Sequence, residues 1–250
     1  MTTLGLEGRI ALVTGGTRGL GLATARRLCA AGCEVSLVYA RSDADAEAAV
    51  ASLSGLKGSA HTVKADVSDA RQVRSAVERV ADRHGRLDIL VHNASSLHPT
   101  QVTSPDLDGI RRDGSVVVDP LLHVAPLLPQ VMGGGPGRVV AVSSAGGTRV
   151  VPGHVGLGMA KAALESLVRY LAVELAPLGI SANAVSTAKL DKGPGTTVPE
   201  AARMLARRTP AGRLTRPEDV ADVIALLCTD EAAWIQGQVI TVDGGLALRP

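Results

Sequence analysis

A single lysine, Lys161, stands in the segment VPGHVGLGMAKAALE, residues 151–165, where few other side chains could take part in acid–base chemistry. The nearest upstream group able to hand over a proton is His154, because none of the residues between them titrates. Residues seven apart on a helix share a face, so both side chains could act at one place if the helix begins early enough. The alternatives are an exposed helix lysine and an ordinary loop histidine. Three glycines leave the start of the helix open: Gly153, Gly156 and Gly158.

A glycine-rich loop is the second chemical signal. The segment TGGTRGLG, residues 14–21, follows an apolar strand and opens a helix. Glycines there let the backbone approach a pyrophosphate, whose charge the free N–H groups and the helix dipole favour. We therefore expect a dinucleotide at this loop rather than a glycine-rich turn without a ligand. The expected contacts come from Gly15, Thr17, Arg18, Gly19, Leu20 and Gly21.

The end of the second predicted strand, Tyr39-Ala40-Arg41-Ser42, indicates which dinucleotide would bind. An acid at this place would bind free ribose hydroxyls, whereas basic residues would neutralise a 2'-phosphate. Arg41 can form a charge-assisted fork to phosphate, Ser42 can add a donor, and Arg18 lies close enough in the glycine loop to join them. The sequence therefore favours NADPH over NADH, the alternative being two solvated surface arginines.

Polar residues also follow the third and fourth predicted strands. They are Asp66-Val67 and Asn93-Ala94-Ser95, at the carboxyl ends of strands, where doubly wound sheets bind ligands. We expect both groups to line the adenine and the adjoining ribose. Asp66 could instead cap the helix that opens near Asp69, which would be a local structural role.

The elements that position these residues alternate between short apolar segments and longer amphipathic ones, which is typical of β-α units around a parallel sheet. Because the strands are apolar throughout, helices should cover both faces of the sheet. We expect a doubly wound α/β fold in one domain, residues 1–250, with a kinked or divided helix before the fifth strand, where prolines interrupt it. The expected strands are residues 9–13, 34–39, 60–65, 87–91, 138–142, 180–185 and 238–242. The expected helices include residues 19–31, 43–53, 69–84, 158–176 and 217–228.

The composition argues against several classes of function. The 250 residues are 46% hydrophobic and 20% charged, with a net charge of +2, so the basic surface that nucleic acid requires is missing. The start, MTTLGLEGR, lacks the apolar core of a signal peptide, and no apolar run is long enough to span a membrane. We therefore expect a cytoplasmic protein with no nucleic-acid, membrane or metal partner. The cysteines should be buried reduced thiols, namely Cys29, Cys33 and Cys228.

As a set, these residues resemble the short-chain dehydrogenase/reductase family over essentially the whole chain. The segment 142–175 is most similar to the NADPH-dependent branch of the enoyl-acyl-carrier-protein reductases. The resemblance implies a Rossmann fold and a nicotinamide cofactor, NADPH/NADP. The matching pieces are TGGTRGLG at 14–21, ADV at 65–67, HNAS at 92–95, VSS at 142–144, NAVS at 183–186 and WIQGQVITVDGG at 234–245.

The resemblance also implies roles near Lys161, which would hydrogen-bond the nicotinamide ribose. Ser144 would donate to the substrate oxygen, and Leu190 would join the cofactor-binding residues. Most members place a tyrosine four residues before the lysine, where this chain has Leu157, while enoyl reductases place it seven before, where it has His154. A neutral imidazole could donate in place of the phenol, since the charge of Lys161 disfavours a second cation nearby.

The implied reaction is NADPH-dependent hydride transfer to an unsaturated acyl thioester in fatty-acid or polyketide metabolism. An enolate oxygen suits a weak acid better than an alkoxide does, which favours reduction of an alkene. Two alternatives stay open: a ketoreductase that tailors a secondary metabolite, and a cofactor-binding protein without redox activity that serves as a partner or catalyses a non-redox step.

The resemblance further implies a homotetramer, although the prolines before the fifth strand make a dimer the alternative. Residues 191–210 read as a mobile substrate lid. Lys189 and Lys192, at its start, could steer an anionic carrier or a thioester phosphate. Family members often hold a relay water with an asparagine, and we expect Val116 at that position.

Overall fold

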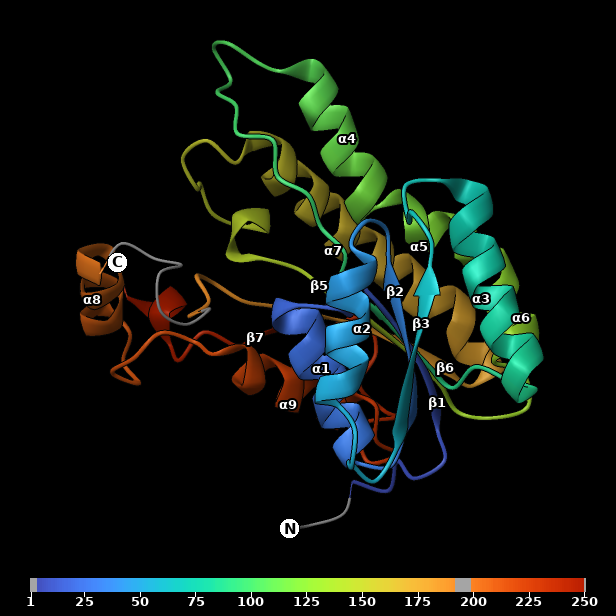
Figure 1. Ribbon diagram of the computed structural model, residues 1–250. Coiled ribbons are helices and arrows are strands. Elements are labelled where there is room, and N and C mark those ends of the chain that lie inside the picture. The colour runs from blue at the N-terminus through green and yellow to red at the C-terminus, as the bar shows by residue number, and fades with distance from the viewer. Residues whose placement is uncertain (1–3, 192–198, 250) are drawn as a thin grey trace.

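The computed structural model describes residues 4–191 and 199–249, which fold around one central seven-stranded parallel sheet (Figure 1). The strands lie in the order β3-β2-β1-β4-β5-β6-β7, and each neighbouring pair is parallel. The doubly wound α/β fold is therefore confirmed. The order reverses between β1 and β4, where such sheets bind ligands at the carboxyl ends of the strands. The strands are β1 Ile10–Thr14, β2 Glu34–Tyr39, β3 Ser59–Lys64, β4 Ile89–His92, β5 Gly137–Val142, β6 Ile180–Ser186 and β7 Val239–Thr241.

Helices cover both faces of the sheet, as the apolar strands predict (Figure 1). One face carries α1, α2 and α9, and the other carries α3, α4, α5 and α7. The helix α8 lies apart from both layers, at the left of the view. The helices are α1 Gly19–Ala30, α2 Asp43–Ser52, α3 Ala70–His84, α4 Leu107–Val117, α5 Asp119–Val124, α6 Leu128–Val131, α7 Val155–Leu175, α8 Pro199–Arg208 and α9 Pro217–Leu227.

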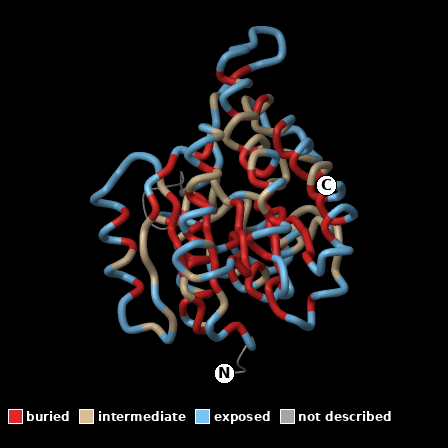
Figure 2. Tube along the Cα trace, turned by 90° about the vertical axis from the view of Figure 1, so that its right-hand side faces the viewer, coloured by how far each residue is buried: buried red, intermediate tan, exposed pale blue. Residues whose placement is uncertain are grey.

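The core is divided into two layers by the sheet. In β1, Ile10 and Leu12 enter the layer under α3 and α7, while Ala11 and Val13 enter the layer under α1 and α9. Side chains alternate between the faces of a strand, so only a strand that is apolar at every position can serve both layers. Figure 2 shows buried residues concentrated along the strands, whereas the exposed segment 101–108 projects at the top.

The segment before β5 is divided, as its prolines predict. Helix α4 ends at Val117, where the N–H of Val118 still donates to the carbonyl of Gly114. A new helix, α5, begins at Asp119 with Pro120 in its first turn, where the missing N–H of proline removes no helical hydrogen bond. The break lets α5 leave the direction of α4 and pack against α3.

Helix α7 begins at Val155, three residues before the predicted start at 158. The predicted start was too late, because the three glycines leave the first turn undecided in the sequence. A Cβ at Gly156 would lie 3.0 Å from the Cα of Ile110 on α4, and one at Gly158 would lie 2.9 Å from the carbonyl oxygen of Gly146. These glycines therefore permit close packing of the first helical turn against α4 and against the loop after β5.

Cys29, Cys33 and Cys228 are buried free thiols, as predicted. Burial raises their pKa values to about 11, 12 and 12 respectively, so all three stay protonated at neutral pH.

Among the described residues, no helix by itself has both the length and the apolar composition of a membrane span; only α4 taken with residues 119–131, across a bend, passes that test.

Candidate nucleotide and catalytic site

The glycine loop after β1 forms a cradle that fits a pyrophosphate. Gly15 and Gly19 have positive φ angles of 62° and 53°. A Cβ at Gly21 would overlap the carbonyl of Gly15, whereas one at Gly19 would meet nothing within 4 Å. No side chain caps α1 at Arg18, so the first N–H groups of the helix stay available to an anion. Beside these glycines Thr17 is half-buried, and Leu20 is buried under the loop.

Two cations flank this cradle. Arg18 and Arg41 are exposed, and within the described part of the chain neither guanidinium has a hydrogen bond or an ion pair. Ser42 caps α2, its Oγ accepting from the N–H of Asp45 at 3.1 Å, and its own hydroxyl hydrogen remains free to donate. The rim therefore offers two fork donors and a hydroxyl, which suits a phosphate.

The residues after β3 and β4 contribute differently. Asn93 donates through Nδ2 to the carbonyls of Thr14 and Gly15, both at 3.1 Å, and so holds the glycine loop. Asp66 is exposed and accepts from the N–H and hydroxyl of Ser68, which is a local turn, while the α3 cap is Asp69. Of the remaining predicted residues, Val67 is buried, Ala94 is half-buried and Ser95 is exposed.

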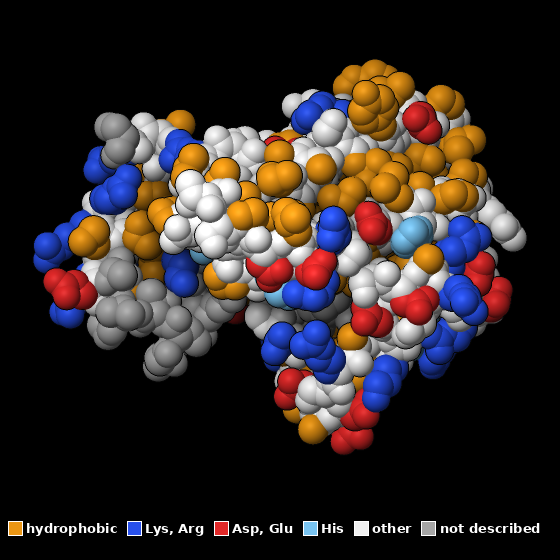
Figure 3. Space-filling view, turned by 90° about the horizontal axis from the view of Figure 1, so that it is seen from above, with side chains coloured by type: hydrophobic (Ala, Val, Ile, Leu, Met, Phe, Trp, Pro, Cys, Tyr) orange, Lys and Arg blue, Asp and Glu red, His pale blue; other side chains and the backbone are white. Residues whose placement is uncertain are grey.

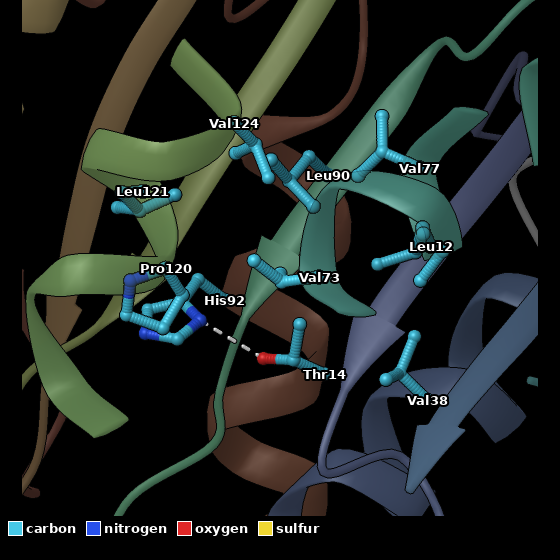
Figure 4. A pocket seen from close by; sticks show the side chains of 11 residues that line it. Leu12, Thr14, Val38, Val73, Val77, Leu90, His92, Pro120, Leu121 and Val124 are labelled. Carbon is cyan, nitrogen blue, oxygen red and sulfur yellow. Dashed lines mark hydrogen bonds between the residues drawn. The ribbon is translucent and has the colours of Figure 1, made fainter. Parts of the chain in front are cut away.

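A buried hydrogen-bond chain supports this loop from below (Figure 4). His92 Nε2 donates to the carbonyl of Val117 at 3.0 Å, so Nδ1 accepts from the hydroxyl of Thr14, also at 3.0 Å. The Thr14 oxygen in turn accepts from the N–H groups of Asn93 and Ala94. The side chains of His92 and Thr14 border a small, mostly apolar cavity with room for about one water molecule. Burial lowers the pKa of His92 to about 4, so the ring is neutral.

Lys161 is buried on α7, with 4% of its surface exposed, and its Nζ donates to the carbonyl of Val142 at 2.6 Å. This contact places the ammonium group at the carboxyl end of β5, the edge of the sheet that carries the glycine loop. Burial lowers the pKa of Lys161 to about 8, and the nearby charge of Glu165 opposes that effect. Glu165 is itself buried and accepts from the hydroxyl of Ser143 at 2.5 Å.

The two serines after β5 face different surroundings, as alternation along a strand predicts. Ser143 is buried against Glu165, whereas Ser144 is half-buried. The Oγ of Ser144 accepts from the N–H of Gly146 at 3.3 Å, and its hydroxyl hydrogen has no acceptor within the described residues. Ser144 is therefore the serine of this pair that can donate to a ligand.

His154 immediately precedes α7 and is half-buried. Its Nδ1 donates to the carbonyl of Pro152 at 2.8 Å, so in the neutral ring Nε2 can only accept. The single N–H of the neutral ring, which the sequence suggested as a donor to substrate, is thus used in the bond to Pro152. Nε2 can donate only when the ring is protonated to the imidazolium. Leu157 packs against the core. The two tyrosines of the chain lie elsewhere: Tyr39 at the end of β2, and Tyr170 exposed on α7, nine residues beyond Lys161.

The segment after β6 leads from the site toward α8. Thr187 is buried and donates to the carbonyl of Val242, and Leu190 pairs with Thr215 in an isolated bridge and packs on the core. Lys189 is exposed. Of the predicted lid, 191–210, residues 192–198 lie outside the described residues, and Lys192 is among them. The rest of the predicted lid includes α8. Val116, expected at the position where relatives hold a relay water with an asparagine, packs on the core, and its side chain has no polar group for such a water.

Sequence reasoning missed a buried carboxylate next to the start of α7. Asp113 is fully buried on α4 and accepts from Ser96 Oγ at 2.9 Å and from His98 Nδ1 at 2.8 Å. It thereby fixes the loop after β4 to α4, next to Gly156 of α7. No local signal marks it, because Asp113 stands between Arg112 and Gly114 and its partners lie 15 and 17 residues upstream.

Comparisons with known proteins agree with this geometry. The family model described as enoyl-(acyl carrier protein) reductase matches residues 15–247. The 1-cyclohexenylcarbonyl-CoA reductase of Streptomyces collinus is 35% identical over 96% of this chain and 87% of its own length. The 3-oxoacyl-acyl-carrier-protein reductase of Thermotoga maritima is 32% identical over 97% and 99%. A short-chain dehydrogenase of Burkholderia cenocepacia, solved in complex with NADP, is 35% identical with a TM-score of 0.88, over 97% and 99% of the two chains. Fold, glycine cradle and sequence similarity together place the chain in the short-chain dehydrogenase/reductase family of oxidoreductases.

Proposed function

We propose that the protein is an NADPH-dependent reductase of unsaturated acyl thioesters. The observation that carries this proposal is the buried Lys161, held at the carboxyl end of β5, on the sheet edge where the glycine cradle and the free arginines lie. The free guanidinium groups of Arg18 and Arg41 favour the 2'-phosphate of NADPH, and the similarity to an NADP complex from Burkholderia cenocepacia supports the same choice.

The side chains of the site suit an oxygen that gains negative charge. The glycine cradle and Lys161 would hold a reduced nicotinamide nucleotide, which when bound would supply a hydride to the β-carbon of the substrate. The hydroxyl of Ser144 donates to the thioester oxygen, and the ammonium of Lys161 stabilises the enolate charge from nearby. The α-carbon then takes a proton from water. Because an enolate is a weaker base than an alkoxide, this reaction needs a weaker proton donor, which suits a site without a tyrosine beside Lys161.

The substrate class rests on similarity and on charge. A relative from Streptomyces collinus is named a cyclohexenylcarbonyl-CoA reductase, and thioesters of this kind carry phosphates. On α8 a hollow is lined by Glu200, Met204 and three arginines, Arg203, Arg207 and Arg208, so its lining is positive on balance, and Figure 3 shows Lys and Arg side chains gathered at that end of the molecule. These charges suit a phosphorylated carrier, either coenzyme A or an acyl carrier protein.

A second candidate is the reduction of a 3-oxoacyl thioester, which the similarity to the Thermotoga maritima enzyme favours. A third is nucleotide binding without redox chemistry, which the absence of a tyrosine near Lys161 favours. The candidates separate when purified protein and NADPH receive a short 2-enoyl or 3-oxoacyl thioester and the absorbance of the reduced cofactor is followed. We expect the enoyl substrate to be consumed faster. Faster use of the oxo substrate favours the second candidate, and nucleotide binding without turnover favours the third.

Side-chain variants then assign the roles. Lys161→Met should abolish turnover, and Ser144→Ala should reduce it by about 10²-fold, the usual loss for one donor to a developing oxyanion. His154→Ala should leave turnover within about threefold, since Nδ1 already donates to the carbonyl of Pro152. A loss comparable with that of Ser144→Ala would return His154 to the catalytic set.

We also propose a homo-oligomer, a tetramer or a dimer. Large apolar side chains lie exposed on α7 and between α9 and β7, including Tyr170 at 66%, Val173 at 75% and Trp234 at 97%. Exposed apolar residues in such numbers are typical of surfaces that another chain covers. Mass measurement in solution should give a multiple of the chain mass, and Val173→Glu should reduce it.

A further inference from the structure

A carboxylate lies beside the rim that is proposed to take the 2'-phosphate. Asp43 is the first residue of α2, two positions after Arg41. Its Oδ1 accepts from Tyr39 Oη at 2.6 Å and from Lys64 Nζ at 2.8 Å, and its Oδ2 accepts from the same ammonium at 2.7 Å. Both oxygens of Asp43 are thus engaged by residues of the two neighbouring strands.

The partners of Asp43 come from the ends of β2 and β3. Tyr39 and Lys64 are register partners in the parallel pair and the last residues of their strands. The ammonium of Lys64 also lies 5.9 Å from the centre of the Tyr39 ring. Lys64 therefore stands on the side of Asp43 that carries β3, and it draws the carboxylate toward that strand.

This pairing changes the charge that a nucleotide would meet. The hydrogen bond from Lys64, and then that from Tyr39, lowers the pKa of Asp43, so the carboxylate is ionised at neutral pH. A free acid at the end of the second strand of such a fold binds the ribose hydroxyls of NADH and repels a 2'-phosphate. Here the ammonium of Lys64 compensates the charge of Asp43, while Arg18 and Arg41 stay free for the phosphate.

We propose that Lys64 is a specificity-determining residue, which withdraws Asp43 from the ribose and so makes the rim selective for the 2'-phosphorylated nucleotide. The proposal rests on the function proposed above, because it assumes that the cradle binds a nicotinamide nucleotide. Lys64 acts through Asp43 and needs no contact with the cofactor.

The test measures the dissociation constants of NADPH and NADH by fluorescence titration at low salt. Lys64→Met should weaken NADPH about five- to tenfold and should not weaken NADH, because only the phosphate is repelled by the uncompensated charge of Asp43, whereas ribose hydroxyls can bind the released carboxylate. Adding Asp43→Asn to that variant should restore NADPH affinity to within about twofold of the wild type, since both charges are then absent. The effect of Lys64→Met should shrink as salt is raised, because these side chains are exposed.

Lys57→Met is the matched control. Lys57 makes a comparable exposed ion pair, with Glu7 at 2.7 Å. It precedes β3, however, and so lies at the amino end of that strand, whereas Lys64 lies at the carboxyl end. It should change neither dissociation constant. If Lys64→Met leaves the ratio of the two constants unchanged, or weakens both nucleotides equally, Lys64 does not determine specificity. That result would still leave nucleotide binding intact, whereas a wild-type protein that binds neither nucleotide overturns the proposed function as well.

Discussion

At the scale of single residues, the unusual feature is a buried carboxylate four positions after the buried Lys161. Glu165 opposes the effect of burial, which lowers the pKa of Lys161 to about 8. Glu165→Gln removes the charge but keeps an oxygen for Ser143, so the pKa of Lys161 should fall further. The lysine would then lose its proton at a lower pH, and the decline of NADPH affinity on the alkaline side should move down by about half to one pH unit.

The pH dependence of NADPH binding, measured by titration across the neutral and alkaline range, checks this prediction. Glu174→Gln is the control, because Glu174 is exposed on the same helix. An alkaline limb that stays in place for both variants would show that Glu165 has no influence on the charge of Lys161. A purely structural role of Glu165 would lower stability without moving the limb.

Residues whose role depends on nearby sequence were predictable, and those that depend on strand register were not. The glycine loop is determined by backbone geometry within one turn, and its strand-loop-helix context is visible in the sequence. Asp43 was missed as a neighbour of Arg41 because its partner Lys64 lies 21 residues away, and only the pairing of β2 with β3 joins them. For His154, the sequence did not show that Nδ1 donates to the carbonyl of Pro152, and its donor role stays a prediction that the turnover of His154→Ala tests.

At the scale of elements, the contact between α4 and α7 depends on glycine. A Cβ at Gly156 would lie 2.9 Å from Asp113 Oδ2 and 3.0 Å from the Cα of Ile110. Gly156→Ala should therefore destabilise the protein by about 1–3 kcal/mol, the usual cost of overpacking. Gly114→Ala is the control, because Gly114 lies inside α4 and a Cβ there meets nothing within 4 Å. It should raise stability by about 0.5–1 kcal/mol through helix propensity.

Urea unfolding of the two variants measures both free energies. Opposite signs are expected from the same substitution on two packed helices. If Gly156→Ala also stabilises, α7 does not approach α4 as closely as described, and its early start at Val155 needs another explanation. The division between α4 and α5 was predictable from proline chemistry, whereas the start of α7 was not, because close packing between helices is not visible in a local pattern.

At the scale of the whole molecule, the buried His92 couples folding to pH. Burial lowers its pKa from 6.5 to about 4. Between these values the unfolded chain binds a proton that the folded chain cannot take, so the free energy of unfolding should fall as the pH drops through this window. The shift corresponds to a loss of up to about 3 kcal/mol. The pKa of His61 is also lowered by burial, so part of the dependence should survive without His92.

His92→Asn removes the titrating ring and leaves an amide that can replace one of its two hydrogen bonds, so the variant should be less stable than the wild type at neutral pH. It should, however, lose less stability on acidification, and the two unfolding free energies should converge toward pH 4. Urea unfolding at neutral and mildly acidic pH measures the difference in slope. His123→Asn, which changes a half-buried histidine outside the Thr14 network, should keep the wild-type slope. Equal slopes for the wild type and His92→Asn would mean that the ring beneath the glycine loop takes up its proton without unfolding, and the loop would then be able to open at mildly acidic pH.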